Sequence, residues 1–271
     1  MASASSEQTL QYVDAHCHLH DHRIAQDVPG IVQRAEAAGV TRMVTCATME
    51  ENFAATKSLA DRYNTVFPCY GIHPWFLDSL SSGWQQVLGD QVAATAGGVG
   101  ETGLDFMDKN ADRDRQIEVF AGHLSLARDL ERPINIHIRK AWDAFIRLLK
   151  KTGPLKTPGL VHSFSGSADL AVLLERYNLY ISFSGSVTRP GAKKVVNALK
   201  AVSQERYLLE TDTPDIYPSI SDQEAHGLNE PKNLPAIAQI AAFRAGVPVP
   251  DFVRQAYANA LEIFAPVFGQ A

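Results

Sequence analysis

Short segments rich in apolar and β-branched residues alternate with longer amphipathic segments along most of the chain. The short segments predict buried strands, and the longer ones repeat their apolar residues at helical spacing. Strands are predicted at residues 13–19, 40–47, 65–73, 96–101, 133–138, 159–164, 179–185 and 206–212. Helices are predicted between them, at residues 29–39, 51–64, 84–90, 111–130, 141–150, 168–177 and 192–202. Pro29 suits the first turn of the first helix, and Gly39 suits the position after its last turn.

This alternation predicts parallel βαβ units, and eight of them in 271 residues predict an α/β fold of the TIM (β/α)8 barrel class. An open, doubly wound sheet is the alternative architecture. Two further helices, at residues 233–246 and 251–264, are expected to complete the outer ring. Because no repeat or Pro/Gly-rich linker divides the chain, we expect a flexible N-terminus at 1–11 and a single domain at 12–271.

Composition narrows the class of protein further. A hydrophobic share of 45% with 20% charged residues is typical of a globular domain, and the net charge of -5 argues against a protein that coats polyanions. The three cysteines are too few for a disulfide framework. No signal peptide or long apolar segment is apparent, so we expect a cytoplasmic protein with no membrane segment and no obligatory protein partner.

The first predicted strand, VDAHCHLH, contains three histidines at alternate positions, His16, His18 and His20. Alternate residues of a strand share one face, so Asp14 and the three histidines would share one side, a pattern compatible with a metal site. A polar strand end with solvated histidines would give the same local pattern. This segment alone therefore leaves both interpretations open.

Residues of metal-binding type also close most of the other predicted strands. The carboxyl ends of parallel strands meet at one mouth of a barrel. The residues at these ends are His16 and His18, His73, Glu101, His137, His162 and Asp212. Burying so many polar groups without compensation is costly, and divalent cations provide that compensation. The sequence therefore predicts a metal site at the C-terminal face of the strands.

Neutral imidazoles mixed with carboxylates suit transition-metal cations better than calcium, and six ligands, four histidines and two carboxylates among these seven residues, suit two ions better than one. Glu101 would then bridge the two ions. Two adjacent cations can clamp the attacking and leaving oxygens of a phosphoryl or acyl transfer. The chemistry predicted from these residues is hydrolysis.

Eight segments of the chain together resemble the signature segments of a known family. They are DAHCHL, YGIHPW, GETGLD, PINIHIRKA, HSFSG, YISFSG, LLETDTP and NEPKNL. In this order and spacing they resemble TatD-type metal-dependent hydrolases, the TatD DNase family of the amidohydrolase superfamily, over residues 12–264. The resemblance implies a TIM barrel that binds two divalent metal ions, with zinc, magnesium and manganese as candidates. It also implies a hydrolase that acts on ester bonds, namely a deoxyribonuclease.

The resemblance also implies roles for single residues. The metal ligands would be His16, His18 and Asp212 for one ion, and His137 and His162 for the other, with Glu101 as the bridge. Asp212 would also act as general base, and His73 would be a non-ligand catalytic residue that contacts a substrate phosphate or the leaving group. The catalytic residues implied are thus Asp212, Glu101 and His73.

Two segments depart from the family pattern. Phe106 is followed by Met107, where the family often has an aromatic pair that stacks on bases. The segment SDQEAHG before the NEP motif is acidic, where many relatives are basic. The first departure indicates weaker base stacking, and the second argues against tight binding of a long polyanion.

Two further residues are candidates for substrate binding. Arg139 follows His137 by two positions, so it shares a strand face with His137 and can reach a phosphate. A solvated arginine at a helix start is the alternative. Ser165 in the first FSG segment can present a backbone N–H group to an anion, although a tight turn explains the segment as well.

Three candidate functions are compatible with these residues. The first is a 3′–5′ exonuclease that cleaves the phosphodiester bonds of single-stranded DNA with water activated by two metal ions. The second is hydrolysis of a carbonyl ester or amide, including aminoacyl-tRNA deacylation, because the same centre polarises a carbonyl, and the acidic SDQEAHG segment favours it. The third is a non-catalytic barrel that serves as a binding module, and the complete ligand set argues against it.

Overall fold

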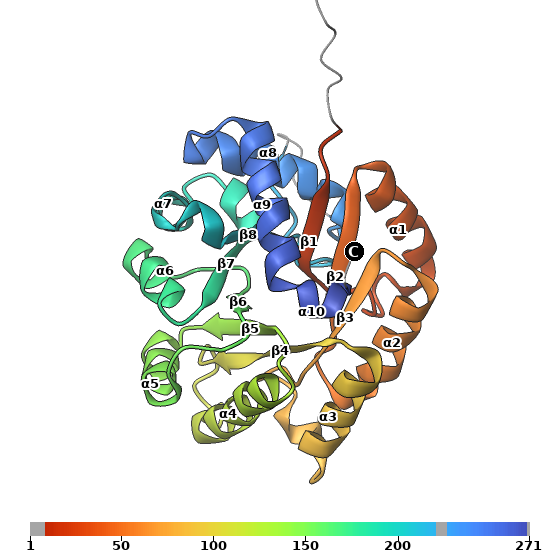
Figure 1. Cartoon of the computed structure of the whole chain (residues 1–271), viewed down its shortest axis with the longest axis vertical. Coiled ribbons are helices and arrows are strands. Elements are labelled where there is room, and N and C mark those ends of the chain that lie inside the picture. The colour runs from red at the N-terminus through yellow and green to blue at the C-terminus, as the bar shows by residue number, and fades with distance from the viewer. Residues whose placement is uncertain (1–8, 221–226, 270–271) are drawn as a thin grey trace, which may run out of the picture.

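A computed structural model describes residues 9–220 and 227–269 of the chain. Eight parallel strands form one sheet in the order β1 to β8, and helices surround it (Figure 1). The predicted TIM barrel is confirmed. The strands are β1 (Tyr12–Cys17), β2 (Val40–Cys46), β3 (Val66–Tyr70), β4 (Gly98–Asp105), β5 (Ile134–Arg139), β6 (Gly159–Val161), β7 (Leu179–Phe183) and β8 (Tyr207–Leu209).

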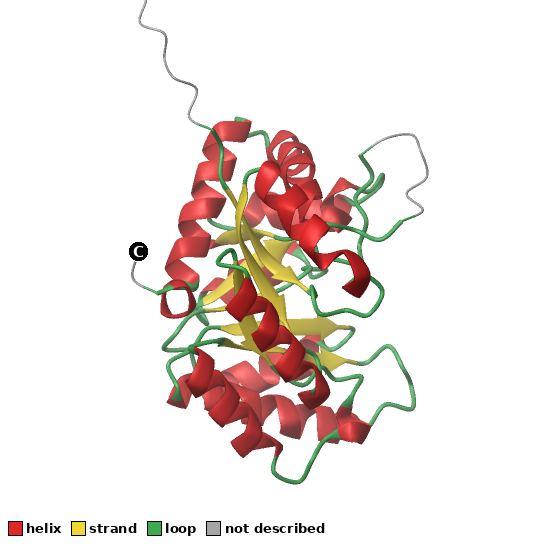
Figure 2. Ribbon diagram, turned by 90° about the vertical axis from the view of Figure 1, so that its right-hand side faces the viewer, coloured by secondary structure: helices red, strands yellow, loops and turns green. Residues whose placement is uncertain are grey.

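Helices connect the strands and cover the outside of the sheet (Figure 2). They are α1 (Val28–Ala37), α2 (Phe53–Arg62), α3 (Trp84–Thr95), α4 (Arg113–Asp129), α5 (Trp142–Thr152), α6 (Ala168–Glu175), α7 (Lys193–Ala201), α8 (Leu234–Ala245), α9 (Val249–Ile263) and α10 (Ala265–Phe268). Pro29 lies in the first turn of α1, and Gly39 follows this helix with a φ of 86°, as its sequence predicts.

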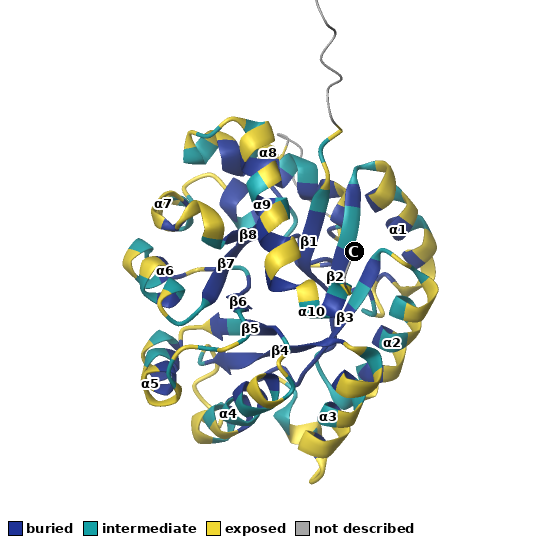
Figure 3. Ribbon diagram, in the orientation of Figure 1, coloured by how far each residue is buried: buried dark blue, intermediate teal, exposed yellow. Residues whose placement is uncertain are grey.

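Both faces of the sheet are buried, whereas the outward faces of the helices are exposed (Figure 3). Ile136 of β5 packs between the sheet and the helices together with Phe145 of α5. Val44 and Tyr180 belong to a second cluster of strand residues. A parallel sheet covered on both faces needs nearly continuous apolar strands, which explains why the apolar runs marked the strands so clearly.

The end of the chain departs in part from the prediction that its last helices complete the outer ring: α8 packs beside α7 in that ring, but the end of α9 and α10 do not. Ile263 of α9 and Val267 of α10 pack against the strand residues Val13, Val44 and Leu208. In Figure 1, α10 lies across the middle of the barrel. Phe268 of α10 packs on Phe67, near the start of β3, and Arg132, just before β5, donates to the carbonyl of Pro266. The end of α9 and α10 therefore cover the end of the barrel opposite the carboxyl ends of the strands.

The barrel closes between β8 and β1 through residues just beyond the regular strands. The N–H group of Asp212 donates to the carbonyl of His16 at 3.0 Å, and the N–H group of His18 donates to the carbonyl of Thr213 at 2.7 Å. These bonds fix three of the predicted site residues relative to one another, because each lies in one of the two joined segments.

Candidate metal centre

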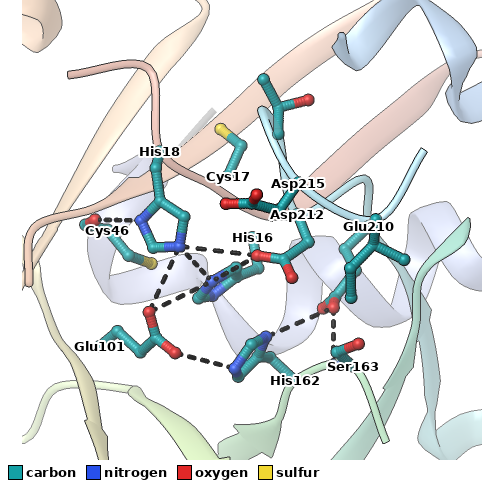
Figure 4. A network of polar contacts seen from close by, with 12 residues as sticks. His16, Cys17, His18, Cys46, Glu101, His162, Ser163, Glu210, Asp212 and Asp215 are labelled. Carbon is teal, nitrogen blue, oxygen red and sulfur yellow. Dashed lines mark hydrogen bonds and ion pairs between the residues drawn. The ribbon is translucent and has the colours of Figure 1, made fainter. Parts of the chain in front are cut away.

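The six residues predicted as metal ligands meet at the carboxyl ends of the strands, and Figure 4 shows five of them, His16, His18, Glu101, His162 and Asp212. They come from five strands or the segments directly after them, and all lie buried or half-buried. Several strand boundaries differ from the prediction. His18, His162 and Asp212 follow β1, β6 and β8 rather than belonging to them, and Glu101 lies inside β4, which continues to Asp105.

Four of these residues form a first donor group: His16 Nε2, His18 Nε2, Glu101 Oε2 and Asp212 Oδ1. The five distances measured between these atoms run from 3.1 to 3.6 Å. Four ligands placed tetrahedrally at about 2.1 Å from a cation would lie about 3.4 Å apart. The spacing of the first donor group therefore fits a divalent cation.

A second donor group uses the other oxygen of Glu101. Glu101 Oε1 lies 2.9 Å from His162 Nε2 and 3.1 Å from His137 Nδ1, and these two nitrogens are 3.0 Å apart. Three protein ligands with one open position are typical of catalytic metal sites. Each oxygen of the Glu101 carboxylate thus faces a different group, which is the arrangement that a bridging ligand requires.

Hydrogen bonds at the far nitrogens of His16 and His18 direct their lone pairs into the first donor group. His18 Nδ1 lies 2.8 Å from the carbonyl of Cys46, which can only accept, so Nδ1 carries the proton. His16 Nδ1 lies 2.9 Å from Asn135 Oδ1, and the Asn135 amide donates to the carbonyl of Ala15. Two unprotonated Nε2 atoms would face one another at 3.1 Å and repel unless a proton or a cation lies between them.

Two buried carboxylates orient the histidines of the second donor group. Asp105 Oδ2 lies 3.2 Å from His137 Nε2, and Glu210 Oε1 lies 3.5 Å from His162 Nδ1. These contacts leave His137 Nδ1 and His162 Nε2 free to act as ligands. Carboxylates in this position also make the imidazole a stronger ligand.

The sequence reasoning did not identify Asn135, Asp105 or Glu210 as site residues. Asn135 precedes His137 by two positions, and Asp105 follows Glu101 by four within one strand, so strand alternation places both on the faces of predicted ligands. That signal was available for these two residues. Glu210 lies beyond β8, where alternation does not apply.

The same alternation fails in β1, where it predicted that Asp14 shares a face with His16 and His18. The pairing of β1 with β2 shifts register between Asp14 and Cys17, which interrupts the alternation. The Asp14 carboxylate accepts hydrogen bonds from the backbone and the hydroxyl of Thr211 instead. Asp14 therefore joins β1 to the segment after β8 and does not contribute to either donor group.

Electrostatics at the centre favour a positive charge in each donor group. Burial lowers the pKa of His18, but Asp212 and Glu101 raise it more strongly, to about 10. Burial likewise lowers the pKa of His162, whereas Glu101 and Glu210 raise it well above its usual value. Burial raises the pKa of Glu101, yet the surrounding histidines hold it well below its usual value. A cation and a proton would therefore compete for each group.

His73 is turned differently from the other histidines. Its Nδ1 accepts a hydrogen bond from the N–H group of Trp75 at 3.1 Å, so the proton lies on Nε2, which is 3.5 Å from Glu101 Oε1. A protonated nitrogen cannot bind a cation. Burial lowers the pKa of His73 to about 3, so the ring is neutral and presents a donor to the centre.

The two other predicted contact residues lie at the mouth. Arg139 is half exposed, and its Nη1 lies 4.0 Å from Asp105 Oδ2. Ser165 is exposed. Two residues earlier, the N–H group of Ser163 donates to Glu210 and its hydroxyl bonds to the hydroxyl of Ser184. The segment SDQEAHG falls at residues 221–227, of which 221–226 lie outside the described residues, as do residues 1–8 of the expected N-terminal segment.

Known proteins are similar to this chain in sequence and in fold. The family described as TatD related DNase matches residues 13–265. The chain belongs to this family. A TatD-family structure, that of the TatD homologue YjjV from Escherichia coli K12, superposes with a TM-score of 0.87 at 27% identity, over 93% of this chain and 97% of that one.

Relatives in the TatD-related family differ in how specifically their names describe an activity. Human deoxyribonuclease TATDN3 is 31% identical over 273 residues, which cover 93% of this chain and 94% of the human protein. The Bacillus subtilis protein YabD, named an uncharacterized metal-dependent hydrolase, is 31% identical over 210 residues, or 76% of this chain and 81% of YabD. This TatD-related chain is therefore a metal-dependent hydrolase, with clusters of histidine and carboxylate side chains able to bind metal.

The helices formed by the described residues are relevant to the prediction of no membrane segment. None of the helices that they form combines the length and the apolar character needed to cross a bilayer.

Proposed function

We propose that this protein is a deoxyribonuclease that removes nucleotides from the 3′ end of single-stranded DNA. The observation that carries the proposal is the division of the Glu101 carboxylate between two donor groups. Such a centre suits cleavage of a phosphodiester, because the attacking and the leaving oxygens both need stabilisation. The name of human TATDN3, a deoxyribonuclease, supports the choice of DNA.

In this proposal His16, His18 and Asp212 would hold one divalent cation, His137 and His162 would hold the other, and Glu101 would serve both. When bound, the cations supply Lewis-acid chemistry, which polarises a phosphoryl oxygen and lowers the pKa of a water. Zinc, magnesium and manganese remain the candidates. The neutral imidazoles favour zinc or manganese over magnesium.

Asp212 is proposed as the general base that accepts the proton of the attacking water. It occupies the left-handed region with a φ of 58°, a conformation that aspartate adopts more readily than most residues. Its N–H group bonds to His16, and its carbonyl accepts from Asp215 at 2.8 Å. These bonds hold the carboxylate in place at the mouth, so that it need not reorganise during the reaction.

His73, Arg139 and Ser165 are proposed to contact the substrate. The Nε2–H group of His73 points toward the centre and can donate to a phosphate oxygen or to the leaving oxygen. Arg139 supplies a positive charge beside the second donor group. The exposed Ser165 can present its backbone N–H group to a phosphate further along the strand.

The test is cleavage of 5′-labelled single-stranded DNA by metal-stripped protein that is refilled with Mg²⁺, Mn²⁺ or Zn²⁺. A ladder that shortens from the 3′ end, lost with chelator and in Asp212→Asn, supports the proposal. Asp108→Asn, at an exposed position outside the centre, is the matched control and should give the wild-type ladder.

Two outcomes would contradict the proposal in different ways. Hydrolysis of a small carboxylic ester without cleavage of DNA would assign the centre to carbonyl chemistry. Full metal content without turnover of either substrate would favour a binding module.

A further inference from the structure

Trp75 lies next to the second donor group and is exposed over 60% of its surface. Its edge is nevertheless fixed, because its Nε1–H group donates to Asp105 Oδ2 at 2.9 Å. Its ring also packs edge-on against His73, with the ring centroids 4.7 Å apart. An indole that is anchored through its edge and its backbone presents a large apolar surface to solvent in a fixed orientation.

The same Asp105 oxygen links Trp75 to the metal centre. Asp105 Oδ2 accepts from both Trp75 Nε1 and His137 Nε2, and the Trp75 and His137 ring centroids are 6.3 Å apart. A group that rests on the indole would therefore lie directly beside the place where the reacting phosphate is proposed to bind. Neither the proposed ligands nor the proposed general base accounts for this exposed ring.

Charged side chains divide the mouth into two unlike sides. Near Trp75, Arg139 projects half-exposed beside Asp105, and the Arg113 guanidinium lies over the Phe106 ring at 4.9 Å. On the opposite side, Arg23 is bound by both Asp21 and Asp215. Arg139 and Arg113 therefore offer positive charge to a phosphate on the Trp75 side, whereas Arg23 on the other side is already paired with two carboxylates.

We propose that Trp75 is a stacking platform for an unpaired DNA base adjacent to the phosphodiester that is cleaved. The proposal rests on the nuclease function proposed above and specifies the substrate as single-stranded, because a base within a duplex has no free face. Stacking uses the flat face that all bases share, so this contact imposes little sequence preference. It replaces the aromatic pair that the sequence lacks at Phe106 and Met107.

The test measures binding, independently of turnover, on the full-length protein. The probes are a short oligothymidylate and an abasic oligomer of equal length and charge, both with phosphorothioate linkages that slow cleavage. For the wild type we expect the oligothymidylate to bind about tenfold more tightly than the abasic oligomer. In Trp75→Ala this preference should disappear, and in Trp75→Phe, which keeps an aromatic face, most of it should remain.

Phe243→Ala, which removes an even more exposed aromatic ring on α8, is the control and should bind both probes as the wild type does. An unchanged preference in Trp75→Ala would overturn the inference. Loss of the preference in Trp75→Phe as well would also overturn it, since the hydrogen bond to Asp105 would then carry the effect.

The failure of this inference can be told from failure of the proposed function. If the wild type cleaves DNA and Trp75→Ala keeps the base preference, the nuclease function stands and the platform is wrong. If the wild type shows a Trp75-dependent base preference but cleaves no DNA, the platform stands and the nuclease function is wrong.

Discussion

Asp105 accepts a hydrogen bond from His137 at a nitrogen that faces away from the metal centre, with Oδ2 and Nε2 3.2 Å apart. This bond keeps the proton of His137 on Nε2 and leaves Nδ1, at 3.1 Å from Glu101, free as a ligand. Burial raises the pKa of Asp105. His137 and the N–H groups of Met107 and Trp75 lower this pKa by more than burial raises it, so the carboxylate stays charged. Asp105 thus determines which nitrogen of His137 the centre can use.

We therefore expect Asp105→Ala to weaken binding of the second metal ion by about 10- to 100-fold, because His137 loses its fixed tautomer and orientation. Titration of metal-stripped protein with Zn²⁺ or Mn²⁺ would measure both binding steps. The first step should change little, since His16, His18 and Asp212 do not contact Asp105. Asp108→Ala, three residues further on, is the control, and equal affinities in both variants would refute this role.

Glu101→Gln removes the charge that both donor groups share while keeping the shape of the side chain. We expect this variant to lose both ions and to lose at least about 100-fold in hydrolysis, because an amide is a poor bridging ligand. Elemental analysis of the purified variant gives the metal content, and circular dichroism tests whether the barrel is folded. Retention of one tightly bound ion would mean that Glu101 serves only one of the two groups.

Arg139→Ala should weaken binding of single-stranded DNA and lower its dependence on salt by about one phosphate contact. Affinity measured over a series of salt concentrations gives this slope. Arg147→Ala removes the same charge from an exposed position on α5 and should leave the slope unchanged. Identical slopes for the wild type and Arg139→Ala would show that Arg139 contacts no phosphate.

His123 provides a test of stability against pH. Burial lowers its pKa from the usual 6.5 to about 4, although a hydrogen bond to the carbonyl of Val119 opposes the shift. Between these values the unfolded chain binds the proton and the folded chain does not. The contribution of His123 therefore destabilises the fold as the pH falls from about 6.5 toward about 4.

The expected loss attributable to His123 is about 2 kcal/mol between about pH 7 and pH 5. His123→Gln keeps an acceptor for the N–H group of Ile72, which His123 Nε2 binds at 3.1 Å, but it does not titrate. Urea unfolding of both proteins in chelator, at each pH, isolates this difference because they share all other titratable groups. Equal losses of stability in the two proteins would contradict the shifted pKa.

The sequence was sufficient to predict the barrel and the meeting of the six candidate ligands at one mouth, because both depend on simple periodicity. Apolar runs mark strands that are buried on both faces. Parallel strands bring His16, Glu101 and His162 to one mouth whatever the conformation of the connecting loops. The partners that orient the ligands were harder to predict. Which carboxylate lies behind His162 depends on the segment after β8, where Glu210 follows no strand alternation.

Irregular backbone limited the prediction in two other places. Strict alternation grouped Asp14 with His16, but the register shift in β1 turns Asp14 to Thr211. The prediction also ended the fourth strand at Glu101, whereas β4 continues through Gly103, which has a φ of 151°. A Cβ atom at Gly103 would meet the carbonyl of His137, so only glycine lets β4 and β5 pair closely there.

The central claim is that one carboxylate joins two metal sites, and the number of bound ions tests it most directly. Metal-stripped protein would be reconstituted with Zn²⁺ or Mn²⁺, freed of excess metal and analysed for ions per chain. We predict two ions in the wild type and one in each of His18→Ala and His162→Ala. A single ion in the wild type, or two ions retained in either variant, would contradict the account.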